Sequence, residues 1–401
     1  MEKLINTVLW IVLLAFIALA VHHWYKNNYE PVVYQQPTEH APPLFKIEEK
    51  VERSDNEGWV RDHFPNPVPA QGQAPEEWTE IEASLSPQQC GVCHPAQLAD
   101  WKDSWHAKGM GPGMMGQLVD WDGPKDGMVK QCQSCHAPLT EQYPRIDGQD
   151  NPLFDAEMRE AGLTCAGCHV RQHARFGPPT QTHPVDAMPG AETEAVEGEA
   201  QPSAEGEEAP RQPHDGFVAR DEFQDAIFCE QCHDFRPGGN GLEDKLIQET
   251  YEEWRRTEFA AQGVTCQSCH MPEGRHQFLG IHDPDMARAA FTPSARLVRG
   301  GTGFMEPLEA ELTIKNTGAG HRFPTYSTPT VVLSFEQIDA QGQVIEGTRD
   351  EGYVSRYVKP NLTEEFWDTR LLPGEEFTLV YRSYLRDQAT ALRARVEVWP
   401  D

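Results

Sequence analysis

The longest run of apolar residues in the chain lies at its N-terminus. Residues 4–21 comprise eighteen positions, only two of them polar, and that length is enough for one helix across a bilayer. Lys3 before the run, and Trp24 and Tyr25 after it, favour a cytoplasmic N-terminus with the rest of the chain on the far side. The sequence therefore predicts a signal anchor, or transmembrane helix, over residues 1–26.

A cleaved signal peptide is the alternative for this segment, because Ala18-Leu19-Ala20 is a small-residue cleavage site. We favour the anchor, since the apolar run is longer than a usual signal core and no polar region precedes the site. Both interpretations export the chain, and cleavage after Ala20 stays open.

The pattern then changes along the chain. Residues 27–85 are rich in proline and poor in apolar clusters, which is typical of a tether. Helical patterns follow, for example over 95–107 and 244–263. Residues 186–215 hold nine acidic residues, four prolines and no aromatic residue, and this composition predicts a disordered acidic insertion.

From residue 289 onward, apolar and polar residues alternate in short segments between glycine, proline and aspartate breaks. This alternation is the pattern of half-buried strands, which we expect at 308–314, 330–338, 344–348, 376–384 and 392–399. The pattern predicts an antiparallel β-sandwich of Ig-like type over residues 289–401.

The chain has 401 residues, with 34 basic and 63 acidic side chains and a formal charge of −29. Such a charge excludes a protein that grips nucleic-acid phosphate, so we expect no nucleic-acid partner. With 38% hydrophobic residues, the chain is not a polytopic membrane protein.

All ten cysteines fall in five C-x-x-C-H motifs. Chance predicts about 0.01 such motifs in a chain of this composition. Their cysteines are Cys90 and Cys93, Cys132 and Cys135, Cys165 and Cys168, Cys229 and Cys232, and Cys266 and Cys269.

This spacing suits covalent haem attachment. Two thiols three positions apart can each form a thioether with a haem vinyl group, and the adjacent imidazole then reaches the iron. A zinc ribbon or a redox dithiol also uses C-x-x-C, but neither needs a histidine after each second cysteine. The sequence predicts five covalently bound haems c in a mostly α, haem-packed body over residues 86–288. The expected proximal iron ligands are His94, His136, His169, His233 and His270.

Because bacteria attach haem covalently in the periplasm, we expect a single-pass protein of the bacterial inner membrane with the bulk of its chain in the periplasm. A surface this acidic favours redox partners that are basic on the contact face.

The second axial ligands must come from the remaining histidines. The candidates are His106, His173, His276, His282 and His321. His173 shares a helical face with His169, so it could serve only a neighbouring haem. His321 lies in a glycine-rich loop between two expected strands, where the sandwich could present it to the last haem. We expect His183 and His214 to be exposed to solvent, and the methionines to pack against porphyrin rather than to bind iron.

Several stretches resemble the multihaem cytochrome c superfamily, most closely its cytochrome c554-like branch. They are WKDSWHA at 101–107, CHAPLTEQ at 135–142, CHVRQH at 168–173, CHMP with HQFLGIH within 269–282, and NTGAGHRFPT at 316–325. The resemblance implies haems with two histidine ligands, arranged in closely stacked pairs, and a role in electron transfer. A fifth motif, the acidic insertion and the C-terminal sandwich depart from the family's four-haem pattern.

We therefore expect a membrane-anchored periplasmic pentahaem cytochrome that relays electrons from a membrane donor to a periplasmic or outer acceptor, a carrier rather than an enzyme. One alternative is an enzyme in which one open haem reduces or oxidises a small nitrogen or sulfur compound, with Arg171, Arg175 or Lys108 binding the anion. Another is an electron-transfer subunit of a larger membrane redox complex.

Overall fold

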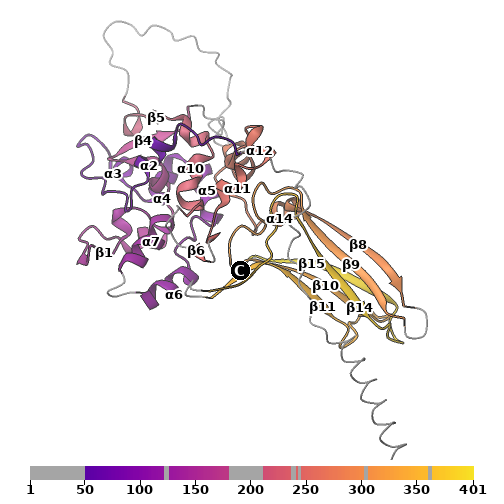
Figure 1. Cartoon of the computed structure of the whole chain (residues 1–401). Coiled ribbons are helices and arrows are strands. Elements are labelled where there is room, and N and C mark those ends of the chain that lie inside the picture. The colour runs from indigo at the N-terminus through magenta and orange to yellow at the C-terminus, as the bar shows by residue number, and fades with distance from the viewer. Residues whose placement is uncertain are drawn as a thin grey trace, which may run out of the picture. The chain divides into compact units, whose positions relative to one another are not determined.

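The computed structural model describes residues 50–121, 126–179, 211–235, 241–242, 245–301, 306–359 and 364–401 (Figure 1). The expected membrane segment, the first part of the expected tether and most of the acidic insertion lie outside these residues. None of the helices within them is long and apolar enough to cross a membrane. The described chain divides into two compact units, one ending at Met286 and the other beginning at Ala287.

The first unit is built from short helices joined by turns, coloured indigo to salmon in Figure 1. Small two- and three-stranded sheets lie among the helices, so the unit mixes the two kinds of element. The α-helices are α2 (Glu57–His63), α3 (Glu80–Ala83), α4 (Pro87–Cys93), α5 (Pro95–Asp103), α6 (Pro112–Trp121), α7 (Asp126–His136), α8 (Ala156–Glu160), α9 (Cys165–His169), α10 (Ile227–His233), α11 (Thr250–Trp254), α12 (Glu258–Ala261) and α13 (Cys266–His270). Helix α14 (Pro284–Ala290) begins in this unit and ends in the second. The 3-10 helices are η1 (Thr140–Gln142), η2 (Pro213–Asp215), η3 (Asp221–Gln224) and η4 (Pro272–Gly274), and the strands are β1 (Arg145–Ile146), β2 (Gln149–Asp150), β3 (Val170–Arg171), β4 (Ala174–Gly177), β5 (Val218–Ala219), β6 (Gly241–Leu242) and β7 (Lys245–Leu246).

Each C-x-x-C-H motif lies on a helix of its own. Helices α7, α9, α10 and α13 end on the motif histidine, and α4 ends one residue before it. Thr265 begins α13 with a capping box to Ser268, which satisfies backbone groups at the helix start. Placing both cysteines and the histidine on one or two helical turns fixes the three side chains relative to one another.

Apolar side chains in the first unit gather in small separate clusters. One holds Val68, Leu139, Met158, Ala166 and Val170. Others hold Val60, Ala226, Ile227 and Tyr251, and Met110, Leu118 and Ala137. Among the described residues these clusters are small, whereas a domain of this size usually has one contiguous core.

Residues 50–85, part of the expected tether, lie within this unit. Val60 and Val68 are fully buried. The backbone N–H of Val68 donates to the carbonyl of Pro138, and Thr140 donates in return to the carbonyl of Val68. This proline-rich segment is therefore ordered and packs against the motif helices.

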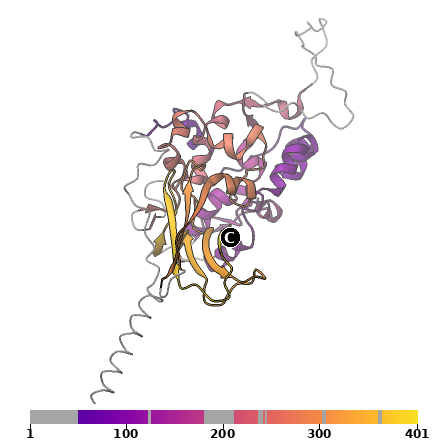
Figure 2. The same cartoon turned by 90° about the vertical axis from the view of Figure 1, so that its right-hand side faces the viewer.

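The second unit contains two three-stranded antiparallel sheets and a hairpin, seen from another side in Figure 2. One sheet has the order β14-β9-β8, and the other β11-β10-β15. The strands are β8 (Phe291–Gly300), β9 (Leu308–Asn316), β10 (Thr330–Ile338), β11 (Asp350–Val354), β14 (Glu376–Ser383) and β15 (Ala391–Trp399), with β12 (Arg356–Val358) and β13 (Glu365–Asp368) forming the hairpin.

Burial alternates along β9, where Leu308, Ala310, Leu312 and Ile314 face inward. Phe335 of β10 contacts Tyr381 of β14, with ring centres 5.4 Å apart, so side chains of the two sheets meet. The expectation of antiparallel sheets in the C-terminal region is confirmed, while the Ig-like topology stays a prediction.

Candidate haem-binding centres

The ten motif cysteines are free thiols that keep accessible surface, Cys93 and Cys269 being the most exposed. Cys168 is only half-buried, yet burial raises the pKa of its thiol to about 11, against the opposing effect of the nearby Arg171 charge. The thiol is thus surrounded by protein although the residue keeps accessible surface.

The fold brings motifs that are distant in sequence together. The thiol of Cys90 interacts with that of Cys165, so the first and third motifs are neighbours. Cys135 and Cys232 interact in the same way, which joins the second motif to the fourth. Cys229 interacts with Cys266 of the fifth motif.

Three motif histidines share one hydrogen-bond arrangement. The Nδ1 atom of His136 lies 2.6 Å from the carbonyl oxygen of Gly109, that of His169 lies 2.8 Å from Phe176 O, and that of His270 lies 2.5 Å from Leu279 O. A carbonyl can only accept, so each Nδ1 carries the proton and Nε2 carries the lone pair. Metal-bound histidines typically hold their second nitrogen in this way. The other two motif histidines differ, with Nδ1 of His233 3.3 Å from the Gln248 amide and His94 at the C-terminal end of α4.

Two expected second ligands lie near motif histidines. The ring centres of His106 and His233 are 6.2 Å apart, and those of His276 and His169 are 6.1 Å apart. A metal bonded to two imidazoles at about 2 Å each sets the ring centres roughly 6 Å apart. Both pairs therefore have the spacing of two axial ligands on one iron.

The surroundings of His106 keep its imidazole neutral. Burial, and next the charge of His233, lower the pKa of His106 to about 3. Its ring meets Phe278 edge-on at 4.2 Å between centres. A neutral imidazole is the form that binds iron.

An acidic residue that the sequence did not single out holds His276. Asp100 of α5 is buried, and it accepts hydrogen bonds from the backbone N–H of His276 at 3.1 Å and from the Arg275 guanidinium at 2.7 Å. The hydrogen bond from Arg275 lowers the pKa of Asp100, against the effect of burial. The only sequence signal for Asp100 is its position directly before Trp101 on an expected helix.

The other three expected ligands have different surroundings. His282 stacks on Trp105 with ring centres 3.7 Å apart. His173 is buried in a turn with φ of 63°, and its Nε2 lies 3.1 Å from the carbonyl oxygen of Gly72. His321 belongs to the second unit, in the loop between β9 and β10, where its Nδ1 lies 2.8 Å from Arg322 O.

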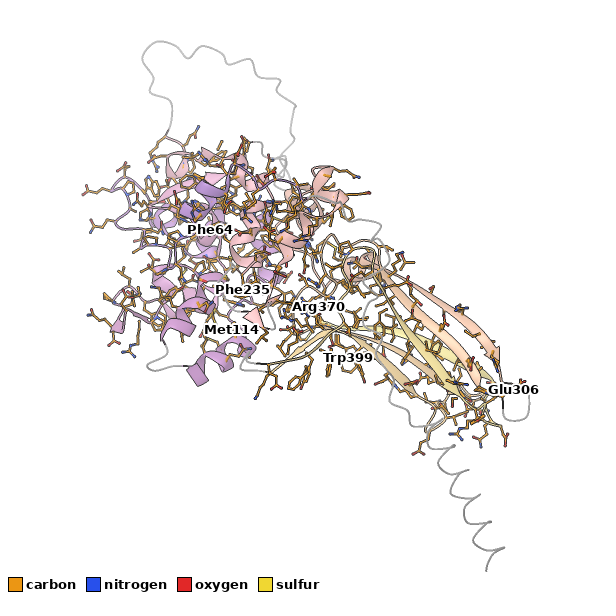
Figure 3. The ribbon with its side chains drawn as sticks, viewed as in Figure 1. Phe64, Met114, Phe235, Glu306, Arg370 and Trp399 are labelled. Atoms are coloured by element: carbon orange, nitrogen blue, oxygen red, sulfur yellow. The ribbon has the colours of Figure 1, made fainter. Side chains whose placement is uncertain are left out.

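His63 is a buried histidine in the segment expected to be a tether. Its Nε2 lies 2.7 Å from the carbonyl oxygen of Cys168, and its ring stacks on Trp59 at 4.4 Å. Figure 3 labels Phe64, the residue that follows His63 in the chain. Burial, and next the charge of Arg171, lower the pKa of His63 to about 3. His63 therefore supports the backbone of the third motif helix as a neutral hydrogen-bond partner.

Comparisons with known proteins found one family model and one solved structure that are similar to this chain. Residues 89–170 match the family model described as cytochrome c554 and c-prime. A solved structure, the crystal structure of a penta-heme cytochrome c552 from Thermochromatium tepidum, is similar with a TM-score of 0.54 and 20% sequence identity, over 79% of this chain and 91% of that chain. No curated protein matches the sequence. The first three motifs of this chain are therefore similar to the cytochrome c554 family, and most of its length shares the fold of a solved multihaem cytochrome.

Proposed function

We propose that this protein is a pentahaem electron carrier in which most irons have two histidine ligands. The observation that carries the proposal is the spacing of the pairs His106 and His233, and His169 and His276, at 6.2 and 6.1 Å. Covalently bound haem supplies a one-electron redox centre, and two imidazoles favour a lower potential than methionine ligation does. The five motif helices supply the thiols, and the Nδ1 hydrogen bonds of His136, His169 and His270 hold these three rings in the tautomer that binds iron.

The arrangement favours a carrier over an enzyme. An enzyme needs an iron with an open position and polar groups aimed at it. The cations that could bind an anionic substrate have structural partners instead. Arg171 donates to the carbonyls of Gly167 and Ala166, Arg175 donates to those of His173 and Glu82, and Lys108 donates to that of Asp103.

Close packing of the motifs supports relay through the first unit. Thiol contacts join the first motif to the third, the second to the fourth, and the fourth to the fifth. Attached prosthetic groups would thus lie near one another, as transfer between them requires.

The membrane anchor at residues 1–26, the periplasmic location in a bacterium and the basic redox partner belong to the same proposal. Residues 50–286 hold 18 basic and 42 acidic side chains, a charge of −24, whereas residues 287–401 hold 13 and 16, a charge of −3. The field that steers a basic partner therefore comes mainly from the haem-binding region.

The test is the intact mass of protein expressed in a host competent for haem attachment, together with its binding of carbon monoxide. We expect a mass increase of five haems and negligible carbon monoxide binding by the reduced protein. A mass showing four or fewer haems would contradict the count, and strong carbon monoxide binding with turnover of nitrite, hydroxylamine or sulfite would contradict the carrier.

A further inference from the structure

The segment that follows the acidic insertion is fixed to the haem-binding unit. Strands β4, before the insertion, and β5, after it, pair in parallel, with Phe176 opposite Val218 and Gly177 opposite Ala219. The 3-10 helix η2 packs on α3, and α3 packs on the first motif helix α4. Residues 211–216 therefore occupy a defined place beside the first motif.

Glu82 of α3 is the residue that holds this segment. Its carboxylate accepts hydrogen bonds from the backbone N–H of His214 at 2.8 Å and from the Arg211 guanidinium at 2.7 and 2.8 Å. It also accepts the Thr79 backbone N–H in the capping box of α3. The hydrogen bonds from Thr79 and His214 lower the pKa of Glu82 to about 2, so its carboxylate stays charged at neutral pH. We call the hydrogen bonds of this carboxylate to Arg211 and His214 the Glu82 clamp.

A second contact fixes the other side of the turn. Asp215 accepts a hydrogen bond from the indole Nε1 of Trp78 at 2.8 Å and one from Arg211 at 3.2 Å. His214 and Asp215 have φ angles of 44° and 57°, in the left-handed region. For residues other than glycine this region costs on the order of 1 kcal/mol each, and such strain persists only where the surroundings impose it.

The ring of His214 has the arrangement of the motif histidines. Its Nδ1 lies 2.8 Å from the carbonyl oxygen of Gly216, just as the Nδ1 atoms of His136 and His169 lie near carbonyls. Nδ1 therefore carries the proton and Nε2 the lone pair. The half-buried position of His214 differs from the solvent exposure that the sequence predicts, because Glu82 and Trp78 draw the end of the insertion onto the body.

His214 and His94 belong to segments that pack on the same helix. His94 directly follows α4, which packs on α3, and Glu82 of α3 accepts the hydrogen bond from the backbone of His214. The fold therefore brings the segment of His214 to the first motif.

We infer that His214 is the second axial ligand of the haem attached at Cys90 and Cys93, opposite His94, and that Glu82 is its positioning residue. The inference rests on the proposed haem binding. It also gives the segment after the insertion a function, because a residue between the third and fourth motifs then supplies an iron ligand to the haem of the first motif.

The main test replaces His214 by alanine in protein with its full haem content. We expect the haem count by intact mass to stay unchanged, and about one fifth of the haem to become high-spin and bind carbon monoxide when reduced. Added imidazole should restore the low-spin spectrum of His214→Ala. An unchanged electron paramagnetic resonance spectrum would overturn the inference while leaving haem binding intact.

A variant that lacks the first haem shows which haem His214 serves. In Cys90→Ala, Cys93→Ala protein, which lacks the first haem, His214→Ala should add no further high-spin signal. A new signal of the same size in that background would assign His214 to another haem and overturn the inference. Wild-type protein without any covalent haem would instead refute the proposed function.

The clamp provides a test that does not remove the ligand. Glu82→Gln should raise the high-spin, carbon monoxide-binding fraction above wild type but below that of His214→Ala. Glu80→Gln is the matched control, an exposed glutamate on the same helix. Equal spectra for the two glutamine variants would remove Glu82 from the positioning role, even if His214→Ala failed to accumulate.

Discussion

The imidazole rings of His169 and His276 lie 6.1 Å apart, although they come from α9 and from the loop after η4. Asp100, on a third segment, fixes the loop by accepting hydrogen bonds from Arg275 and from the backbone of His276. The proposed second axial ligand His276 is thus positioned by a buried carboxylate that is far from it in sequence. Glu82 holds His214 in the same manner, so carboxylate clamps on loops are a repeated device of this fold.

Asp100→Asn tests the first clamp. Because an amide cannot pair with the Arg275 charge, we expect the ring of His276 to lose its fixed position and one haem to become partly high-spin. His276→Ala should give the complete effect, about one fifth of the haem. Asp103→Asn, an exposed change on the same helix, is the control and should leave the electron paramagnetic resonance spectrum as in wild type. A wild-type spectrum for His276→Ala would contradict the pairing with His169.

Gly162→Ala tests the backbone beneath His106. Gly162 has φ of 68°, and an added Cβ would lie 2.6 Å from the carbonyl oxygen of His106. We expect a loss of about 2–4 kcal/mol in the free energy of unfolding, from the unfavourable φ together with the clash. Gly263→Ala is the matched control, with φ of 73° and open space around the new Cβ, and should lose only about 1 kcal/mol. Chemical denaturation of the two variants side by side measures the difference, and equal losses would show that the close approach to His106 is unimportant.

The sequence could predict the attachment chemistry, because C-x-x-C-H is local and each motif carries its own helix. It also located β9, β10, β14 and β15, whose alternation reflects one buried face. It did not reveal β8, which pairs with β9 but is exposed along most of its length. Nor could it find Asp100 or Glu82, since their roles depend on contacts between distant segments, or His63, whose burial results from packing beside Trp59 in a proline-rich stretch.

His63 should make stability depend on pH in the acid range. Its pKa is about 3 in the folded protein, against an ordinary value of 6.5, chiefly because of burial and next because of the charge of Arg171, with His169 and Arg220 acting in the same sense. As the pH falls, His63 therefore binds a proton in the unfolded chain before it does so in the folded protein. Its contribution to the free energy of unfolding is fully present above pH 6.5 and decreases as the pH falls towards 3. The slope from this one group is up to about 1.4 kcal/mol per pH unit.

His63→Gln removes that proton while keeping a donor for the carbonyl of Cys168. We expect the variant to lose less stability than wild type between pH 6.5 and 4, whatever its stability at neutral pH. Urea unfolding at a series of pH values measures this, and parallel curves for the two proteins would show that His63 is not a source of the acid sensitivity.

Deleting residues 192–208 separates the charge of the acidic insertion from the ligand that follows it. The deletion removes seven acidic residues but leaves Arg211, His214 and the Glu82 clamp in place. Steering of a basic redox partner is screened beyond roughly 10 Å at 0.1 M salt, so the association rate of wild type should fall as salt rises. We expect a shallower salt dependence after the deletion, measured by stopped-flow electron transfer with a basic redox protein, and an unchanged haem spectrum. An identical salt dependence would place the steering charge on the remaining surface of residues 50–286, and a new high-spin signal would mean that the insertion itself, and not the clamp, holds His214.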